Sequence, residues 1–288
     1  MKISIITICK NEKNTIEETF LSVFNQTYKN IEYIVIDGVS TDGTLDIIQK
    51  YKEKISYFSS EPDTGIYNAL NKGIKIATGD ILYFLNANDM LNSNDIFEKI
   101  VYHFKNDNEL DFVFGNVQFI DENRQECGIF NSNCFKTIFS FKKACINHQS
   151  IFYRSNVFNR FGLYNETYKT NADYDFNLRL LMANGLKAKY LDTTIGRYQL
   201  GGLSCTNNDG NANYIFNLHF IELTKKHKWI KIAYKIDEII NEAKNNDICF
   251  KIDKFLSKFF RSPYKFIKKR LNIINFIMHL YPIKLNLS

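Results

Sequence analysis

The stretch from residue 61 to residue 89, EPDTGIYNALNKGIKIATGDILYFLNAND, constrains the fold more than any other part of the chain. After a polar loop, apolar residues recur at every fourth position from Ile66 to Ile74, which is the spacing of a helix face. An apolar run, Ile81 to Leu85, then predicts a buried strand, and it leads into the polar residues Asn86 to Asp89. Oxygen-bearing side chains at the carboxyl end of a buried strand are where open α/β sheets hold ligands. An ordinary polar strand end would look the same, so this stretch alone leaves both interpretations open.

Strands and helices are expected to alternate along the N-terminal part of the chain. Apolar runs predict strands near residues 2–8, 32–37, 55–59 and 80–85, and helical patterns lie near 14–25, 42–53, 65–77 and 93–105. This alternation predicts an α/β fold with a mostly parallel, Rossmann-like sheet and helices on both faces.

The rest of the chain is patterned differently. We expect a strand at 111–119, a long polar segment at 120–150, a helix at 173–184 and a short extended stretch at 188–193. From residue 212 onward the pattern is helical almost to the end. We therefore expect one domain at 1–210 and a basic helical C-terminal extension at 211–288.

Basic charge is concentrated in that extension. Residues 225–288 hold 15 Lys and Arg against 5 Asp and Glu, whereas the whole chain has a formal net charge of +6. Apolar residues at helical spacing alternate with these charges, a pattern typical of basic amphipathic helices that bind anionic membrane surfaces. Packing of the same helices on the N-terminal domain explains the pattern equally well. No recognition motif supports binding to nucleic acid.

The sequence also bears on location. Met1 leads directly into a short strand, and no apolar run approaches the ~18 residues of a membrane span. The six cysteines are scattered and form no CxxC pair, which favours reduced thiols. We therefore expect a cytoplasmic protein, with peripheral binding to the inner membrane face as one use of the basic extension.

Five blocks together resemble family 2 glycosyltransferases of the GT-A fold. They are the first strand with KNE at 10–12, DGVSTDGT at 37–44, DTGIYNALNKGI at 63–74, LNAND at 85–89 and ADYDFNLRL at 172–180. They cover roughly residues 1–205, and GIYNALNKGI is similar to the variant in bacterial enzymes that assemble surface polysaccharides. The resemblance implies a GT-A domain that binds a nucleotide-sugar such as a UDP-sugar. It also implies an inverting transfer to a hydroxyl of a glycan or lipid-linked glycan.

The resemblance implies donor contacts at the ends of the first strands. Asp37 would accept a hydrogen bond from the nucleotide base, and Thr7 and Glu12 would line the same crevice. Lys72, on the helix before the fourth strand, would offset diphosphate charge. Glu12 as an exposed loop acid and Lys72 as a solvated helix lysine remain open alternatives.

The strand end at 86–89 departs from the family pattern. The family has an aspartate at the position of Asn88 and often another at the position of Asn86. The resemblance implies a Mn²⁺ or Mg²⁺ ion that bridges the donor diphosphate, with Asp89 and Asn88 as ligands and with Asn86 and Asn88 beside the donor. Only Asp89 keeps a full negative charge, and charge count tunes the affinity for a hard cation. We therefore expect weak or substrate-dependent metal binding.

Asp173 falls on the position of the catalytic base in the resembled family, although Ala172 replaces the glutamate that commonly precedes it. An inverting transfer needs one carboxylate beside the acceptor hydroxyl and no covalent nucleophile. An acid at the start of a helix is also favoured by the helix dipole, which is the structural alternative.

Two further pairs belong to the same resemblance. His148 and Gln149 are similar to a His-Gln pair that we place in the acceptor half of the cleft, or they are structural. Gly201 and Gly202 would belong to a loop that closes over the diphosphate, or to an ordinary glycine-rich turn.

Two other functions remain as alternatives. A sugar-nucleotidyltransferase would carry a glycine-rich basic triphosphate loop near its N-terminus, which KNE at 10–12 is not. A non-catalytic nucleotide- or glycan-binding relative is the second alternative, motivated by the missing acids at 86 and 88.

Overall fold

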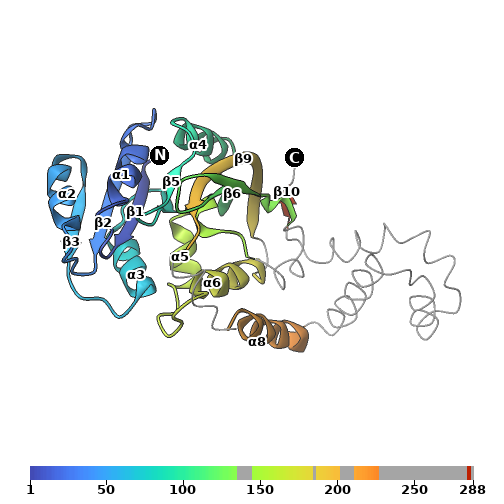
Figure 1. The fold of residues 1–288 in the computed structure, drawn as a ribbon. Helices are drawn as coiled ribbons and strands as arrows, with labels where there is room; N and C mark the ends of the chain where they lie inside the picture. Colours follow the sequence, from blue (N-terminus) through green and yellow to red (C-terminus); the bar gives the residue numbers. More distant parts are fainter. Residues whose placement is uncertain (135–144, 184–185, 202–210, 227–283, 287–288) are drawn as a thin grey trace, which may run out of the picture.

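The computed structural model shows one large sheet with helices packed on both of its faces (Figure 1). It describes residues 1–134, 145–183, 186–201, 211–226 and 284–286. The strands are β1 (Ile3–Cys9), β2 (Ile31–Asp37), β3 (Tyr57–Ser60), β4 (Ile81–Phe84), β5 (Met90–Leu91), β6 (Phe112–Ile120), β7 (Glu126–Phe130), β8 (Ile151–Arg154), β9 (Lys187–Gln199) and β10 (Lys284–Asn286). The α-helices are α1 (Ile16–Phe24), α2 (Thr44–Lys50), α3 (Ile66–Ile76), α4 (Ile96–Asn106), α5 (Asn156–Phe161), α6 (Ala172–Leu181) and α8 (Asn211–Lys226). The predicted α/β alternation is confirmed.

The sheet is mostly parallel along its path. Among the described residues its order is β10-β9-β6-β8-β4-β1-β2-β3. The pairs β1–β2, β1–β4, β2–β3, β6–β9 and β9–β10 are parallel, whereas β8 runs antiparallel between β4 and β6. The carboxyl ends of β1, β2 and β4 therefore lie along one edge of the sheet, where α/β folds hold ligands.

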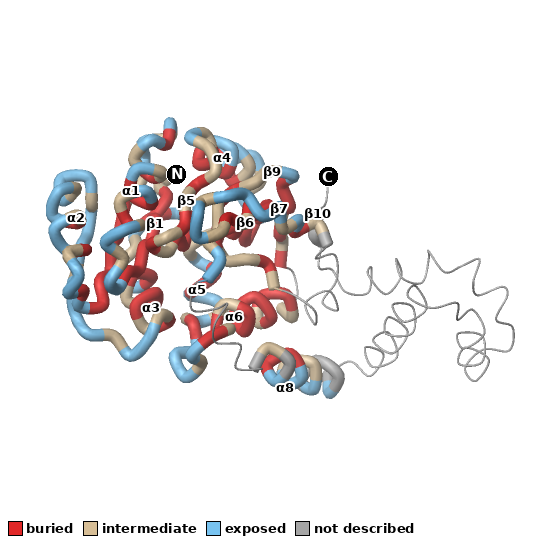
Figure 2. The backbone as a smooth tube through the Cα atoms, in the orientation of Figure 1, coloured by how far each residue is buried: buried red, intermediate tan, exposed pale blue. Residues whose placement is uncertain are grey.

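Two hydrophobic clusters hold the helices onto the two faces. Successive residues of the central strands alternate between them: Ile6, Leu82 and Phe84 belong to one cluster, and Ile5 and Tyr83 belong to the other. The first cluster includes residues of α3, α5, α6 and α8, and the second includes residues of α1, α2 and α4. Figure 2 shows the buried residues along the central strands and on the inner sides of these helices.

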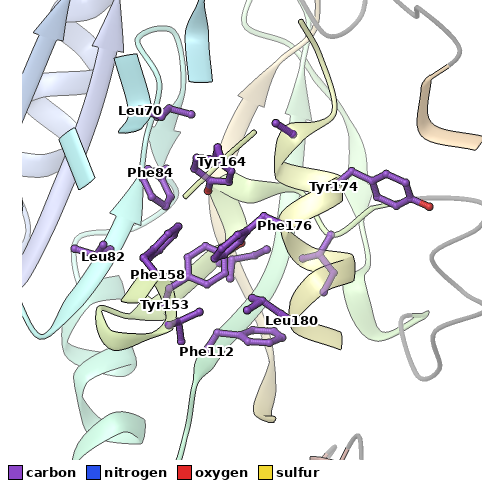
Figure 3. Packing of buried hydrophobic residues seen from close by; sticks show 14 of the residues in the cluster. Leu70, Leu82, Phe84, Phe112, Tyr153, Phe158, Tyr164, Tyr174, Phe176 and Leu180 are labelled. Atoms are coloured by element: carbon purple, nitrogen blue, oxygen red, sulfur yellow. The ribbon is translucent and has the colours of Figure 1, made fainter. Parts of the chain in front are cut away.

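Aromatic packing fixes α6 against the sheet. Phe176 is fully buried and stacks on Phe158 of α5 with ring centroids 4.5 Å apart. Tyr153 of β8 and Tyr164 contact the same ring edge-on (Figure 3). Truncation of a buried phenylalanine costs roughly 3–5 kcal/mol, so this cluster sets the position of the helix that begins at Ala172.

The structure differs from the sequence-based expectations in three places. The segment 120–150 contains strand β7, which pairs with β6, and the short 3-10 helices η2 (Ser132–Cys134) and η4 (His148–Ser150). The extended stretch expected at 188–193 is part of the longer strand β9. Residues 284–286 form β10, which pairs with β9, and no strand was expected there.

The start of the C-terminal extension packs on the N-terminal domain. Ile215 and Phe216 of α8 are buried in the cluster that contains α6. No helix in the part of the chain that the structure describes is long and apolar enough to cross a membrane. The amphipathic helices expected at 227–283 lie outside the described residues.

Candidate active site

A cavity of about 1370 Å³ opens at the carboxyl ends of β1 and β4. Its wall is formed by the loop after β1, the start of α3, the β4–β5 turn, η4, the segment before α6 and the end of β9. Seven predicted site residues line it: Glu12, Asn86, Asn88, Asp89, His148, Gln149 and Asp173. Segments far apart in the sequence therefore meet in one cleft.

Asp173 lies in the first turn of α6 and reaches this cavity. Its Oδ1 accepts a hydrogen bond of 2.9 Å from the Tyr67 hydroxyl, and its Oδ2 lies 3.3 Å from His148 Nδ1. Burial raises the pKa of the Asp173 carboxyl, but the hydrogen bond and the electrostatic attraction from His148, together with the hydrogen bond from Tyr67, outweigh burial and hold that pKa below its usual value. Asp173 is therefore ionised at neutral pH, while its side chain remains 21% exposed.

His148 connects Asp173 with the end of β4. Its Nε2 lies 3.0 Å from Asn86 Nδ2. The sequence placed His148 in the acceptor half of the cleft, and the structure brings it directly beside Asp173.

Asp89 is a buried carboxylate with both oxygens in use. Gln149 Nε2 donates to its Oδ2 at 2.6 Å, and the Gln199 backbone N–H donates to its Oδ1 at 3.2 Å. Burial raises the pKa of Asp89 to about 6, against the opposing hydrogen bond from Gln149. Asp89 thus ties the β4–β5 turn to η4 and to the end of β9.

The oxygens near Asp89 fit a weakly held hard cation. Asn88 Oδ1 and Asn86 Oδ1 are buried and have no hydrogen-bond partner among the described residues. Amide and carboxylate oxygens are the ligands that Mg²⁺, Mn²⁺ and Ca²⁺ prefer. The described residues hold no group of three or more His, Cys, Asp and Glu side chains arranged for a metal ion. The donor set is therefore of the right chemical type but carries little charge.

The cavity wall carries more acids than bases. Its carboxylates are those of Glu12, Asp63, Asp89, Glu166 and Asp173, and its lysines are Lys10 and Lys169. Burial raises the pKa of the Glu12 carboxyl above its usual value, and a hydrogen bond from Thr15 opposes that effect. The wall therefore carries more potential negative than positive charge, and a cation beside an anionic ligand would offset part of that repulsion.

Three predicted donor residues do not line the cavity. Thr7 is fully buried and donates to the Leu85 carbonyl at 2.6 Å. Asp37 is fully buried, and its carboxylate accepts hydrogen bonds from Ser40 and Ser60. Neither residue lines the cavity in this arrangement, and the donor contacts expected for them stay a prediction.

Lys72 is the third. Its Nζ donates to the Pro62 carbonyl at 2.9 Å and lies 3.7 Å from Glu61. These contacts tie Lys72 to the loop before α3, and the direct contact with a diphosphate stays a prediction. Gly201 is exposed with φ +94°, and Gly202 lies outside the described residues.

The structure adds residues that contact the predicted site residues or the segments that carry them, and sequence reasoning missed them. Tyr67 stands within the DTGIYNALNKGI block, but only the fold shows that its hydroxyl meets Asp173. Asn71, from the same helix, bonds the backbone of Tyr164 and the carboxylate of Glu166, and it thereby fixes the segment that leads into α6. No local pattern marked Gln199 as a partner of Asp89.

Comparison with known proteins agrees with this geometry. A profile described as Glycosyl transferase family 2 matches residues 4–167. A PGL/p-HBAD biosynthesis glycosyltransferase of Mycobacterium bovis is 34% identical over 189 residues, covering 64% of this chain and 72% of that protein.

Two solved structures are similar in fold. S. aureus TarS in complex with UDP-GlcNAc has a TM-score of 0.62 at 20% identity, covering 78% of this chain and 67% of that one. The mannosyltransferase PcManGT from Pyrobaculum calidifontis, in complex with GDP-Man and Mn²⁺, has a TM-score of 0.53 at 19% identity, covering 77% and 64%. These likenesses show that the fold is the GT-A fold.

Proposed function

The chain belongs to glycosyl transferase family 2 and is a glycosyltransferase, and we propose that it moves a sugar from a nucleoside-diphosphate-sugar to a hydroxyl group with inversion. The observation that carries the proposal is the ionised Asp173 carboxylate, held by Tyr67 and His148 at the wall of the large cavity. Such a carboxylate is placed to act as a general base.

The proposed transfer is a single displacement that needs one general base and forms no covalent intermediate with the enzyme. Asp173 accepts the proton of the acceptor hydroxyl as its oxygen attacks the anomeric carbon. The bond between that carbon and the diphosphate oxygen breaks on the opposite face, so the configuration inverts, and the nucleoside diphosphate leaves with the bonding electrons. Because the hydrogen bonds keep the pKa of Asp173 low, the proton moves to it as the new bond forms and not before.

The donor is proposed to enter beside the carboxyl ends of β1 and β4. TarS binds UDP-GlcNAc and PcManGT binds GDP-Man, which supports a nucleotide-sugar donor and favours a UDP-sugar as the first to test. The acidic wall supports a divalent cation as a companion of the diphosphate. Asn88 and Asp89 would hold Mn²⁺ or Mg²⁺, and the bound ion would neutralise diphosphate charge.

The acceptor is proposed to be a glycan or a lipid-linked glycan of the cell surface. Relatives named for PGL/p-HBAD biosynthesis support a surface-glycan role. The basic charge of residues 225–288 supports contact with an anionic membrane on the cytoplasmic side, where a lipid-linked acceptor would lie.

A screen of nucleotide-sugars tests the proposal. Thermal shift and donor hydrolysis with UDP-, GDP- and TDP-sugars, each with Mn²⁺, should identify one donor class. With that donor, Asp173→Asn should lower kcat by ~10²–10⁴-fold while donor binding survives. Asp175→Asn is the matched control on α6, because Asp175 pairs with Arg179 and His219 and does not line the cavity.

The outcomes separate the alternatives. Donor binding without turnover by the parent protein would indicate a non-catalytic relative. Near-normal transfer by Asp173→Asn would remove this carboxylate from the mechanism, and an equal loss in Asp175→Asn would show that any change on α6 disrupts the site.

A further inference from the structure

Three contacts run through the cavity wall from the end of β4 to α3. Asn86 Nδ2 lies 3.0 Å from His148 Nε2, and His148 Nδ1 lies 3.3 Å from Asp173 Oδ2. The Tyr67 hydroxyl completes the series at Asp173 Oδ1. All four residues line the cavity, and the His148 side chain is only 20% exposed.

The identity of residue 86 sets the proton position on His148. A neutral imidazole carries one N–H and one lone pair, and the nitrogen of an amide can only donate. Because Asn86 Nδ2 faces His148 Nε2, this nitrogen accepts, and the imidazole proton lies on Nδ1. His148 Nδ1–H then donates to Asp173, as a second-sphere histidine donates to a carboxylate elsewhere in proteins.

An aspartate at position 86 would act in the opposite direction. Its carboxylate can only accept, so it would draw the imidazole proton to Nε2. A neutral His148 would then turn the lone pair of Nδ1 toward the Asp173 carboxylate. An imidazolium would avoid this clash, but its full positive charge would weaken Asp173 as a base.

We propose that Asn86 and His148 are positioning residues for Asp173: the Asn86 amide fixes the tautomer of His148, and the His148 Nδ1–H orients the base carboxylate. The inference rests on the proposed function of Asp173. Asn86, which the sequence analysis placed beside the donor, is here assigned a role at the catalytic base. The proposal also gives a chemical reason for an asparagine at position 86, where the family often has an aspartate.

The other groups around Asp173 do not replace His148 in this role. Four titratable groups among the described residues interact electrostatically with Asp173: Tyr67 of α3, Tyr153 of β8, Tyr164 after α5 and Cys145 before η4. Burial raises the pKa of each of these groups, so they stay uncharged near neutral pH. None of these four groups presents a ring nitrogen to Asp173 as His148 does, with Nδ1 at 3.3 Å from Oδ2.

Substitutions of His148 distinguish the roles of its two ring nitrogens, Nδ1 and Nε2. An asparagine amide reaches about as far as Nδ1 and can still donate to Asp173, whereas a glutamine amide reaches about as far as Nε2 and faces Asn86. His148→Asn should keep kcat within about threefold of the parent. His148→Gln and His148→Leu should lose about 10- to 100-fold in kcat, the usual effect of a misplaced catalytic group. For these two variants, the KM for the donor should stay within about twofold of the parent value. The acidic limb of the profile of kcat against pH should move to higher pH.

Two Asn→Asp substitutions provide a second, matched pair. Asn86→Asp should lower kcat, because it reverses the His148 tautomer. Asn30→Asp makes the same chemical change at an exposed residue that does not line the cavity, and it should leave kcat and the pH profile in place. Equal kcat in Asn86→Asp and the parent would overturn the assignment of Asn86.

Nitrogen NMR of His148 in the intact parent protein tests the proposal without any turnover. The Nδ1–H tautomer is expected, and an Nε2–H tautomer would overturn the inference. A ¹³C titration of Asp173 should show a higher pKa in His148→Leu than in His148→Asn, and equal values would also overturn it. If no donor is turned over by the parent protein, the proposed function fails while these two measurements still decide the positioning role.

Discussion

Asp89→Asn should change how the free energy of unfolding depends on pH. Asp89 is 4% exposed, and burial raises its pKa from 3.8 to about 6 in the folded protein. Between these two pH values the folded state binds a proton that the unfolded state has released. The contribution of Asp89 is therefore most favourable below pH 3.8 and is lost as the pH rises through about 6.

The size of the effect follows from the shift. Each pKa unit corresponds to 1.36 kcal/mol, so a shift of about two units corresponds to ~3 kcal/mol at most. The variant cannot titrate at this position. Its free energy of unfolding, relative to the parent, should therefore rise by up to ~3 kcal/mol between pH 4 and pH 7, on top of a constant loss from the broken hydrogen bonds.

Urea denaturation followed by far-UV circular dichroism at pH 4, 5, 6 and 7 measures this difference. Comparing the two proteins at each pH cancels the other titrating groups. Asp42→Asn is the control of opposite sign, because hydrogen bonds lower the pKa of Asp42 to about 2. The free energy of unfolding of Asp42→Asn, relative to the parent, should stay nearly constant from pH 7 to pH 5. It should rise only as the pH falls toward 4, whereas that of Asp89→Asn rises as the pH increases. A difference for Asp89→Asn that stays constant within about 0.5 kcal/mol across the range would refute the reasoning from burial.

Three further predictions follow from the same structure. Asn88→Asp adds an acid at the strand end, so calorimetry should show Mn²⁺ binding tighter than the roughly millimolar affinity expected of the parent. Gly73→Ala would place a Cβ 2.4 Å from Ile6 Cγ2, where α3 packs on β1, so urea denaturation should show a loss of ~1–3 kcal/mol. Deletion of residues 251–288 should reduce co-sedimentation with anionic liposomes while donor hydrolysis persists, since each Lys or Arg near such a surface contributes ~1 kcal/mol. Unfolding of the catalytic domain by that deletion, with no liposome binding by the intact protein, would instead show that these residues pack on the core.

The sequence predicted the N-terminal half well because hydrophobic periodicity is local. The helix with apolar residues from Ile66 to Ile74 is α3, and the run from Ile81 is β4. Strand β7 was missed because its residues are mostly exposed and lack an apolar face. The length of β9 was missed because its second half pairs with β5 and β6 in a way that its own pattern does not record.

The site was only partly predictable for a related reason. The blocks marked Asp173, His148 and Asp89 as functional residues, and all three line one cavity. Their partners depend on contacts between distant segments: Tyr67 is 106 residues from Asp173, and Gln199 is 110 residues from Asp89. Asp37 stands at a strand end as expected, yet whether such a carboxylate faces the cleft or the turn is decided by serines at 40 and 60 that offer it hydrogen bonds.

The cavity holds two carboxylates whose surroundings separate their proton affinities. Burial dominates at Asp89 and raises its pKa, whereas donors from His148 and Tyr67 dominate at Asp173 and lower its pKa. When the surroundings push the pKa values of two acids in one site apart, the two acids can have different chemical roles. Asp173 is ionised and partly exposed, so it can receive a proton from an acceptor hydroxyl. Each oxygen of Asp89 accepts one hydrogen bond and keeps a lone pair for a cation, and a cation beside it would favour the ionised form. Asn86 and Asn88 lie in the same cavity wall and are neutral, so in the proposed reaction they would add no negative charge beside the donor diphosphate or His148.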